Sequence, residues 1–159
     1  MYWFNIKALK EDLKKGELSQ KEQMHYILAT FTFVAIMQEL AVYFPIEDSA
    51  TYLDYIDSFL YLLILISGII YSYIVNGANS GKNFMQRYIS ISFVLGIRYT
   101  IFFIIFSSLT IFTLVALESF ANEDLEPYIE VIFVFLVNIF YLIYTYFVVK
   151  NIHEVAVKE

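Results

Sequence analysis

The sequence predicts an all-α membrane protein, a bundle of four transmembrane helices with both termini in the cytoplasm. Three observations predict this class. The chain has 159 residues, 60% of them hydrophobic, which exceeds the apolar share of an ordinary soluble domain. Four separate apolar runs interrupt the polar sequence. The positive charges outside those runs all fall in alternate segments, as expected when successive loops lie on opposite sides of a bilayer.

The four apolar runs define the expected spans, at residues of about 24–44, 55–75, 92–117 and 128–149. Each contains the roughly 20 residues that cross a hydrocarbon core of about 30 Å. The third run extends back to Tyr88, so we expect the first turns of its helix at or below the inner interface. Residues 19–159 are therefore treated as one transmembrane domain.

The loop charges orient these spans. Lys and Arg occur before the first span, between the second and third, and after the fourth. The loops at 45–54 and 118–127 contain neither Lys nor Arg. By the positive-inside rule these two acidic loops are external and the N-terminus, middle loop and C-terminus are cytoplasmic.

Residues 1–18 form a cytoplasmic amphipathic segment. Tyr2, Ile6, Leu9 and Leu13 have helical spacing, and Gly16 is a suitable helix stop. An interfacial helix on the inner leaflet fits this pattern; the alternative is a short soluble cap over the helix ends. The predicted lipid or partner contacts at the inner surface are Trp3, Lys7, Lys10, Lys14, Lys82 and Arg87.

Local signals predict where the long helices begin and end. The sequence from Ser19 to Glu22 has the form of a capping box, which places a helix start at Ser19. Pro45 ends that helix, and the second helix begins around Asp54. Asn76 and the glycine after it stop the second helix. Pro127 lies where the fourth helix begins, a position that tolerates the missing amide.

An internal repeat is a further hypothesis. The second and fourth spans align without gaps at an offset of 73 residues, with matches that include Tyr55 with Tyr128 and Ile70 with Ile143. Two parallel helical hairpins would explain the matches. The alternative is a shared use of Tyr, Ile and Val at membrane interfaces.

Two charged residues lie within the expected spans. Glu39 is roughly 7 Å inside the external boundary at 1.5 Å per residue, and such a carboxylate either serves proton-coupled transport or reaches the headgroups. Arg98 lies near the midplane, or snorkels to the inner headgroups if its helix enters lipid later. A direct contact between the two would require both side chains to be extended. Gln38 and Asn138 are further polar candidates, which interhelical hydrogen bonds would explain.

The middle loop from Asn76 to Asn83 departs from a phosphate-binding P-loop at both ends, so a turn at the inner surface explains it better. Its pattern of Asn76-Gly77, Gly81, Phe84 and Arg87, followed by Gly96-Ile97-Arg98, resembles one found in small uncharacterised bacterial four-span membrane proteins. The resemblance covers about a fifth of the chain. It implies a bacterial inner-membrane location and no particular activity.

The expected function is non-catalytic. We expect no metal and no cofactor, because the chain has no cysteine and its two histidines lack carboxylates at ligand spacing. The leading hypothesis is a membrane protein that acts through self-association or as the membrane subunit of a larger assembly, with the lipid bilayer, further copies or a soluble cytoplasmic protein as partners and no nucleic acid. The alternative is a small-solute or ion transporter or channel that uses Glu39 and Arg98.

Overall fold

The structure is a computed structural model, which describes residues 1–16, 18–42, 51–121 and 126–157. All regular structure in these ranges is helical. A short helix α1 (Ile6–Lys15) precedes four long helices, α2 (Gln20–Val42), α3 (Tyr52–Val75), α4 (Phe84–Ala121) and α5 (Glu126–Ala156). A single 3₁₀ turn, η1 (Ala78–Ser80), lies between α3 and α4.

Side-chain caps fix the starts of three helices. Asn5 accepts a hydrogen bond from the amide of Ala8 at the start of α1. At α2, the Ser19 amide donates to Glu22 Oε2 at 3.0 Å and the Glu22 amide donates to Ser19 Oγ at 3.3 Å, which confirms the predicted capping box. Thr51 and Asp54 form a second capping box at α3. α3, the second of the four expected long helices, therefore begins at Tyr52, slightly before the start that we expected around Asp54.

The ends of the helices also follow local sequence. Gly16 has φ +67° and its amide donates to carbonyls of α1, so the predicted glycine stop is confirmed. α3 ends at Val75, directly before Asn76, as predicted. α4 begins at Phe84, earlier than the predicted lipid boundary. Pro127 is the second residue of α5. The predicted stop at Pro45 lies outside the described residues.

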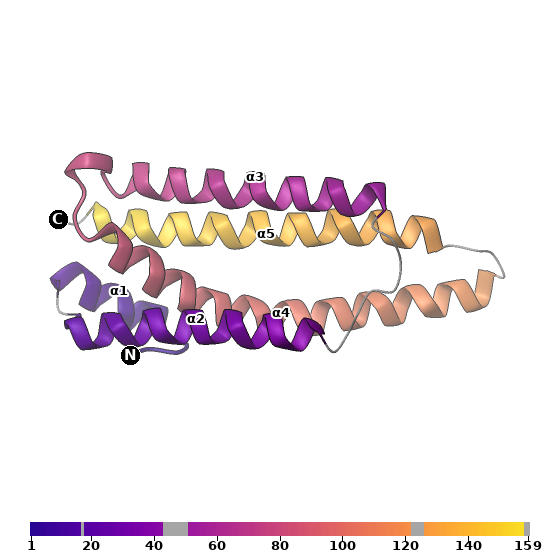
Figure 1. Cartoon of the computed structure of the whole chain (residues 1–159), viewed down its shortest axis with the longest axis horizontal. Helices are drawn as coiled ribbons and strands as arrows, with labels where there is room; N and C mark the ends of the chain where they lie inside the picture. The colour runs from indigo at the N-terminus through magenta and orange to yellow at the C-terminus, as the bar shows by residue number, and fades with distance from the viewer. Residues whose placement is uncertain (17, 43–50, 122–125, 158–159) are drawn as a thin grey trace.

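The long helices lie side by side in the order α2, α4, α5, α3 (Figure 1). Within the described ranges, the packed pairs of long helices are α2 with α4, α4 with α5, and α5 with α3, whereas α2 and α3, consecutive in the chain, do not form such a pair. α2 and α4 run in one direction, α3 and α5 in the other (Figure 1). Alternating directions arise in any chain of consecutive spans, so the hypothesis of two parallel hairpins stays a prediction. In the described residues the helices form a row with α2 and α3 at its edges, and the expected four-helix bundle stays a prediction.

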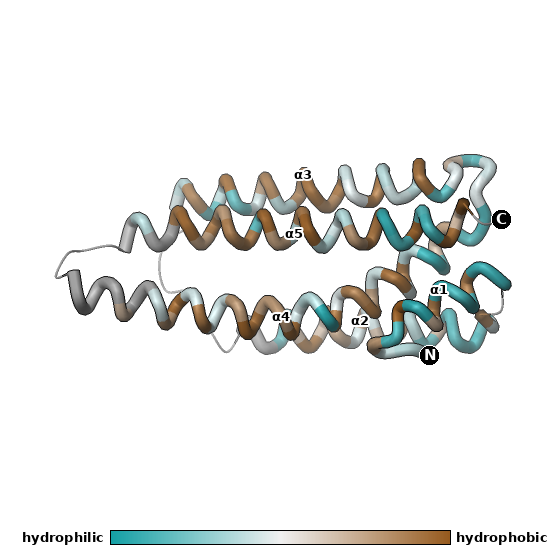
Figure 2. Tube along the Cα trace, turned by 180° about the vertical axis from the view of Figure 1, so that it is seen from behind, coloured by the Kyte–Doolittle hydropathy of each residue, from teal (hydrophilic) through white to brown (hydrophobic). Residues whose placement is uncertain are grey.

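The tightly packed core lies at the end of the row that carries both termini. Leu9 and Leu13 of α1 pack there with Ile91 of α4 and with Ile152 and Val155 of α5, all of them buried. Hydrophilic residues concentrate around α1 at this end, while hydrophobic residues recur along the long helices (Figure 2). α1 therefore turns its apolar face toward protein.

This packing differs from the interfacial helix that we expected before Gly16. The helix is present, but Leu9 and Leu13 are 0% and 3% exposed, so they are not available to insert into a leaflet. The packing of α1 on α4 and α5 fits the alternative, a cap over the helix ends, better. Trp3 and Phe4, which precede the helix, are about half exposed and keep the amphipathic character that the pattern indicates.

Among the described residues, three helices are long and apolar enough to cross a membrane, over Tyr52–Val75, Phe84–Thr113 and Val131–Ala156. The described residues expose 11171 Å² of surface, against roughly 8,300 Å² for a compact soluble protein of this mass. Much of the excess is contributed by large apolar side chains of the long helices, which lipid or other protein can cover.

Candidate functional site

A polar pair lies between α3 and α5, inside both apolar spans. Asn138 is 5% exposed, and its Nδ2 donates to Asp57 Oδ1 at 2.5 Å and to the Val134 carbonyl at 2.9 Å. The Asn138 Oδ1 atom is buried and has no hydrogen-bond partner among the described residues. Buried polar atoms without a partner are rare and costly, so this pair is the most distinctive polar feature of the spans.

Close helix packing holds the pair in place. A Cβ at Gly68 would overlap the Cγ2 methyl of Thr145, so the missing side chain lets α3 and α5 approach each other. Ser72, one turn further along, is 1% exposed. Tyr61 and Tyr141 pack with ring centroids 4.9 Å apart. Gly68 and Ser72, two small residues spaced one turn apart on α3, therefore serve contact within the chain.

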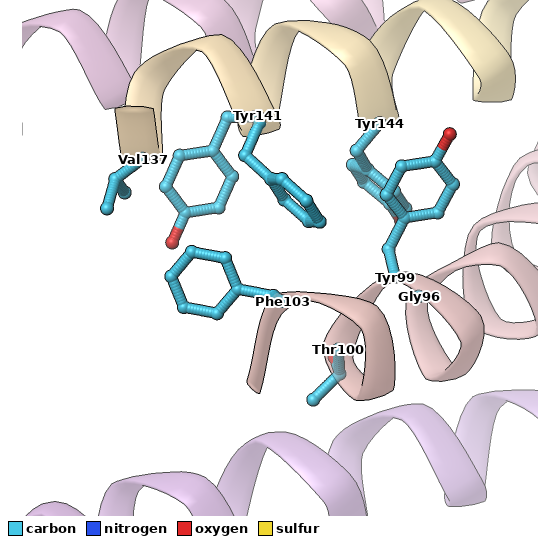
Figure 3. A pocket seen from close by; sticks show the side chains of 8 residues that line it. Gly96, Tyr99, Thr100, Phe103, Val137, Tyr141 and Tyr144 are labelled. Carbon is cyan, nitrogen blue, oxygen red and sulfur yellow. The ribbon is translucent and has the colours of Figure 1, made fainter. Parts of the chain in front are cut away.

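An aromatic pocket of about 180 Å³ separates α4 from α5 (Figure 3). Tyr99 and Phe103 of α4 face Tyr141 and Tyr144 of α5 across it. The Tyr144 hydroxyl donates to the Ser92 carbonyl at 3.0 Å, which satisfies that hydroxyl within the protein. The other polar groups of the lining are the hydroxyls of Tyr99, Thr100 and Tyr141. The pocket therefore has the character of incomplete helix packing between aromatic residues.

Arg98 and Glu39 are not brought together. The Arg98 guanidinium is exposed and donates a hydrogen bond to the Phe4 carbonyl, in the segment before α1. This contact places Arg98 at the level of the N-terminal segment, which agrees with the snorkelling interpretation. Glu39 and Gln38 are exposed on α2. Of the four intramembrane candidates, only Asn138 lies in a buried polar contact.

The middle loop forms a locked turn around one buried cation. Arg87 is 1% exposed and donates from Nη1 to Asn76 Oδ1 at 3.0 Å. The Asn76 Nδ2 donates to the Lys82 carbonyl at 3.3 Å, and a Cβ at Gly81 would overlap the Asn76 backbone. The motif that carries the family resemblance is thus a structural turn. We expected Arg87 to contact lipid or a partner at the inner surface. The structure corrects this prediction, because the buried side chain does not reach lipid headgroups.

The other predicted surface residues differ in exposure. Trp3, Lys7 and Lys82 are exposed, and Lys14 is half-buried. Lys10 forms an ion pair with Glu154 of α5 at 2.5 Å, so its charge is engaged inside the protein. Three of the six predicted surface contacts are consequently open to lipid or to a partner.

Two titratable groups near the N-terminus have shifted pKa values. The Tyr2 hydroxyl donates to Asp12 Oδ2 at 2.5 Å, and this hydrogen bond to a carboxylate raises the pKa of Tyr2 to about 12. The hydrogen bonds from Ser19 hold the pKa of Glu22 below its usual value. Both groups stabilise the junction between residues 1–5, α1 and the start of α2.

Asp57 is absent from the residues predicted from the sequence. It lies within the expected second span, but its position near the helix start suggests a solvated carboxylate. No signal in the sequence pairs it with Asn138. At the offset of 73 residues Asp57 aligns with Glu130, and Asn138 lies eight residues further along the fourth span.

The fold and these polar contacts define a helical protein with three long, membrane-span-like apolar helices. Comparison with models of known protein families, with curated proteins and with solved structures finds no match.

Proposed function

We propose that the chain is a four-span inner-membrane protein of a bacterium, with both termini in the cytoplasm, that has no catalytic activity and acts by self-association or as the membrane subunit of a larger assembly. Three of the spans are the apolar helices α3, α4 and α5. We propose α2 as the fourth span because of its position in the row.

The contacts of α1 support a membrane-spanning α2. α1 packs against the last turns of α5, through the Lys10–Glu154 ion pair and through Leu9 and Leu13. α3, in contrast, begins at the opposite end of the row (Figure 1). α2 is the described helix between α1 and α3, and its length of 23 residues is close to the 24 residues of α3. Its 23 residues measure about 35 Å, enough for a hydrocarbon core.

The polar side chains of α2 carry the proposal of association. Gln38 and Glu39 are exposed on an edge helix of the row. In a bilayer, exposed amide and carboxylate groups near the end of a span are costly when they face lipid. An interhelical hydrogen bond to another protein removes that cost. A second copy of α2 offers the same two groups in self-complementary form.

Cysteine cross-linking in membranes tests this interface directly, because the chain contains no native cysteine. Ala35 is exposed and lies one turn before Gln38 and Glu39 on the same helix face. We expect Ala35→Cys to form a disulfide-linked dimer, and the matched control Ile66→Cys, exposed on α3 at the other edge, to stay monomeric. Adding Gln38→Ala and Glu39→Ala to Ala35→Cys should reduce the dimer. Equal cross-linking at both edges would exclude the α2 interface.

A second candidate function is transport of a proton or small solute, and the Asp57–Asn138 pair is the observation that favours it. A carboxylate inside a span with a buried, unpartnered amide oxygen beside it is typical of ion and proton pathways. Glu39 and Arg98, the original candidates, do not lie in one polar contact.

Reconstituted protein separates the two candidates. Transport predicts a flux across liposome membranes, driven by a pH gradient, that Asp57→Asn abolishes and Glu39→Gln leaves intact. Flux equal to that of empty liposomes would remove transport and leave association as the proposed function.

A further inference from the structure

A groove distinct from the pocket of Figure 3 lies between α4 and α5, and its lining suits a hydrocarbon chain. Its volume is about 480 Å³, and apart from Arg98 its lining is apolar or aromatic. Phe102 stacks on Phe106 and on Phe140, with interplanar angles of 13° in both pairs. Tyr99 and Phe140 line this groove and also the pocket of Figure 3, so these two rings divide the groove from the pocket.

One end of the groove carries a cation. Arg98 lies at the lining position nearest the chain termini, and Phe106 lies eight residues further along α4, which corresponds to about 12 Å of helix. Arg98 is bonded to the Phe4 carbonyl, next to the exposed Trp3 and one turn before the exposed Lys7. Aromatic and basic side chains together mark the headgroup level of a bilayer. The groove therefore runs from headgroup level into the apolar span.

The charge of Arg98 lacks a counter-ion within the described residues, because no carboxylate there forms an ion pair with it. Its hydrogen bond to Phe4 uses one of the five N–H donors of a guanidinium. Guanidinium binds phosphate oxygens with paired, charge-assisted hydrogen bonds. A cation in a span needs an anion to offset its charge, and a lipid phosphate is available at this depth.

We propose that this groove binds an anionic phospholipid, with the phosphate on Arg98 and one acyl chain along Phe102, Phe106 and Ile139. The inference rests on the membrane location proposed above and does not depend on self-association. Charge complementarity selects the occupant. The groove combines one cation with an apolar lining, and a phospholipid supplies an anion joined to hydrocarbon chains, whereas a second copy of the chain would have to place a carboxylate at Arg98.

Lipid titration of the delipidated full chain, in mild detergent and read by native mass spectrometry, tests the site. Phosphatidylglycerol and phosphatidylcholine with identical acyl chains serve as probes. Both lipids carry a phosphate, but the choline ammonium of phosphatidylcholine cancels its charge beside Arg98. We therefore expect phosphatidylglycerol to bind about tenfold more tightly, which corresponds to about 1.4 kcal/mol. Arg98→Gln should abolish this preference, Arg98→Lys should keep most of it, and the matched control Lys82→Gln, which removes an exposed cation of the middle loop, should leave it unchanged.

Two further arms distinguish the sources of phosphate and verify the groove. Glycerol phosphate, which has the headgroup without the chains, should not compete; full competition would overturn the acyl groove. Ile139→Trp should fill the groove and weaken binding of both lipids, whereas Ile66→Trp, exposed on α3, should not. Equal affinity for the two lipids, or a preference that survives Arg98→Gln, would overturn the proposal. Because association is measured separately at Ala35→Cys, a negative lipid result leaves that proposal testable.

Discussion

Lys10 of α1 and Glu154 of α5 form an ion pair at 2.5 Å across 144 residues of sequence. The side chains are 16% and 41% exposed, so the pair is partly solvated. Its importance is geometric, because it holds the N-terminal helix against the end of the last helix. The pair therefore fixes the end of the row at which α1 lies.

Reversing one charge of the pair should loosen α1. We expect Lys10→Glu to lower the free energy of unfolding in detergent by about 0.5–1 kcal/mol, because two carboxylates would then face each other. The double variant Lys10→Glu with Glu154→Lys should recover most of the loss. Thermal unfolding of the purified variants measures both effects. A double variant as unstable as the single one would show that the pair is not a direct interaction.

Truncating the buried face of α1 should cost more than changing its charge. Leu13 is 3% exposed in the core shared with α4 and α5, so Leu13→Ala should destabilise the protein by about 2–5 kcal/mol through lost burial and a cavity. The control is Lys7→Ala on the exposed face of α1, with an expected change within about 0.5 kcal/mol. An interfacial α1 would give the opposite result, with Leu13→Ala weakening lipid attachment and leaving the stability in detergent unchanged.

The contact between Gly68 and Thr145 predicts a specific rescue. Gly68→Ala places a methyl group against the Thr145 Cγ2 atom, which should cost about 1–3 kcal/mol as overpacking. Thr145→Ser removes that Cγ2 atom and keeps the hydroxyl, so the double variant should be more stable than Gly68→Ala alone. Additive losses in the double variant would contradict the parallel packing of α3 on α5 at these residues.

Acid should weaken the start of α2. The pKa of Glu22 is lowered from its ordinary value of 4.5, first by the backbone hydrogen bond from Ser19. A lowered folded-state pKa contributes stability that is fully present above pH 4.5 and is lost as the pH falls through the folded-state value. Wild-type protein should therefore lose stability below about pH 4.5, and Glu22→Gln should show a smaller dependence over the same range. Identical pH profiles would exclude Glu22 as the titrating group.

The helices were predictable from the sequence because local chemistry determines them. The capping box at Ser19, the stop at Asn76 and the apolar runs act over short distances. The order of the helices in the row was not predictable from the sequence, since apolar faces of similar composition do not specify which neighbour they meet. The same reason explains why α1 was expected on lipid, where its buried leucines would be equally favourable.

The polar residues also divide into those that the sequence predicts and those that depend on the folded structure. Asn138 was predicted, because an amide in an apolar run is conspicuous. Its partner Asp57 was not, because pairing depends on the relative register of α3 and α5, which the structure places with Asp57 opposite Asn138. Arg87 shows the converse: a loop cation is ordinarily exposed, and its burial against Asn76 depends on the folded turn.

The central claim is that α2 crosses the membrane with α3, α4 and α5, and labelling of single cysteines from each side tests it most directly. Suitable positions outside the spans are Asn5, Thr51, Asn79 and Val157, all exposed or in a turn. In intact cells, a membrane-impermeant thiol reagent should label Thr51→Cys and should reach Asn5→Cys, Asn79→Cys and Val157→Cys only after the membrane is opened. Labelling of Asn5→Cys from outside while Val157→Cys stays protected would give three spans and contradict the account.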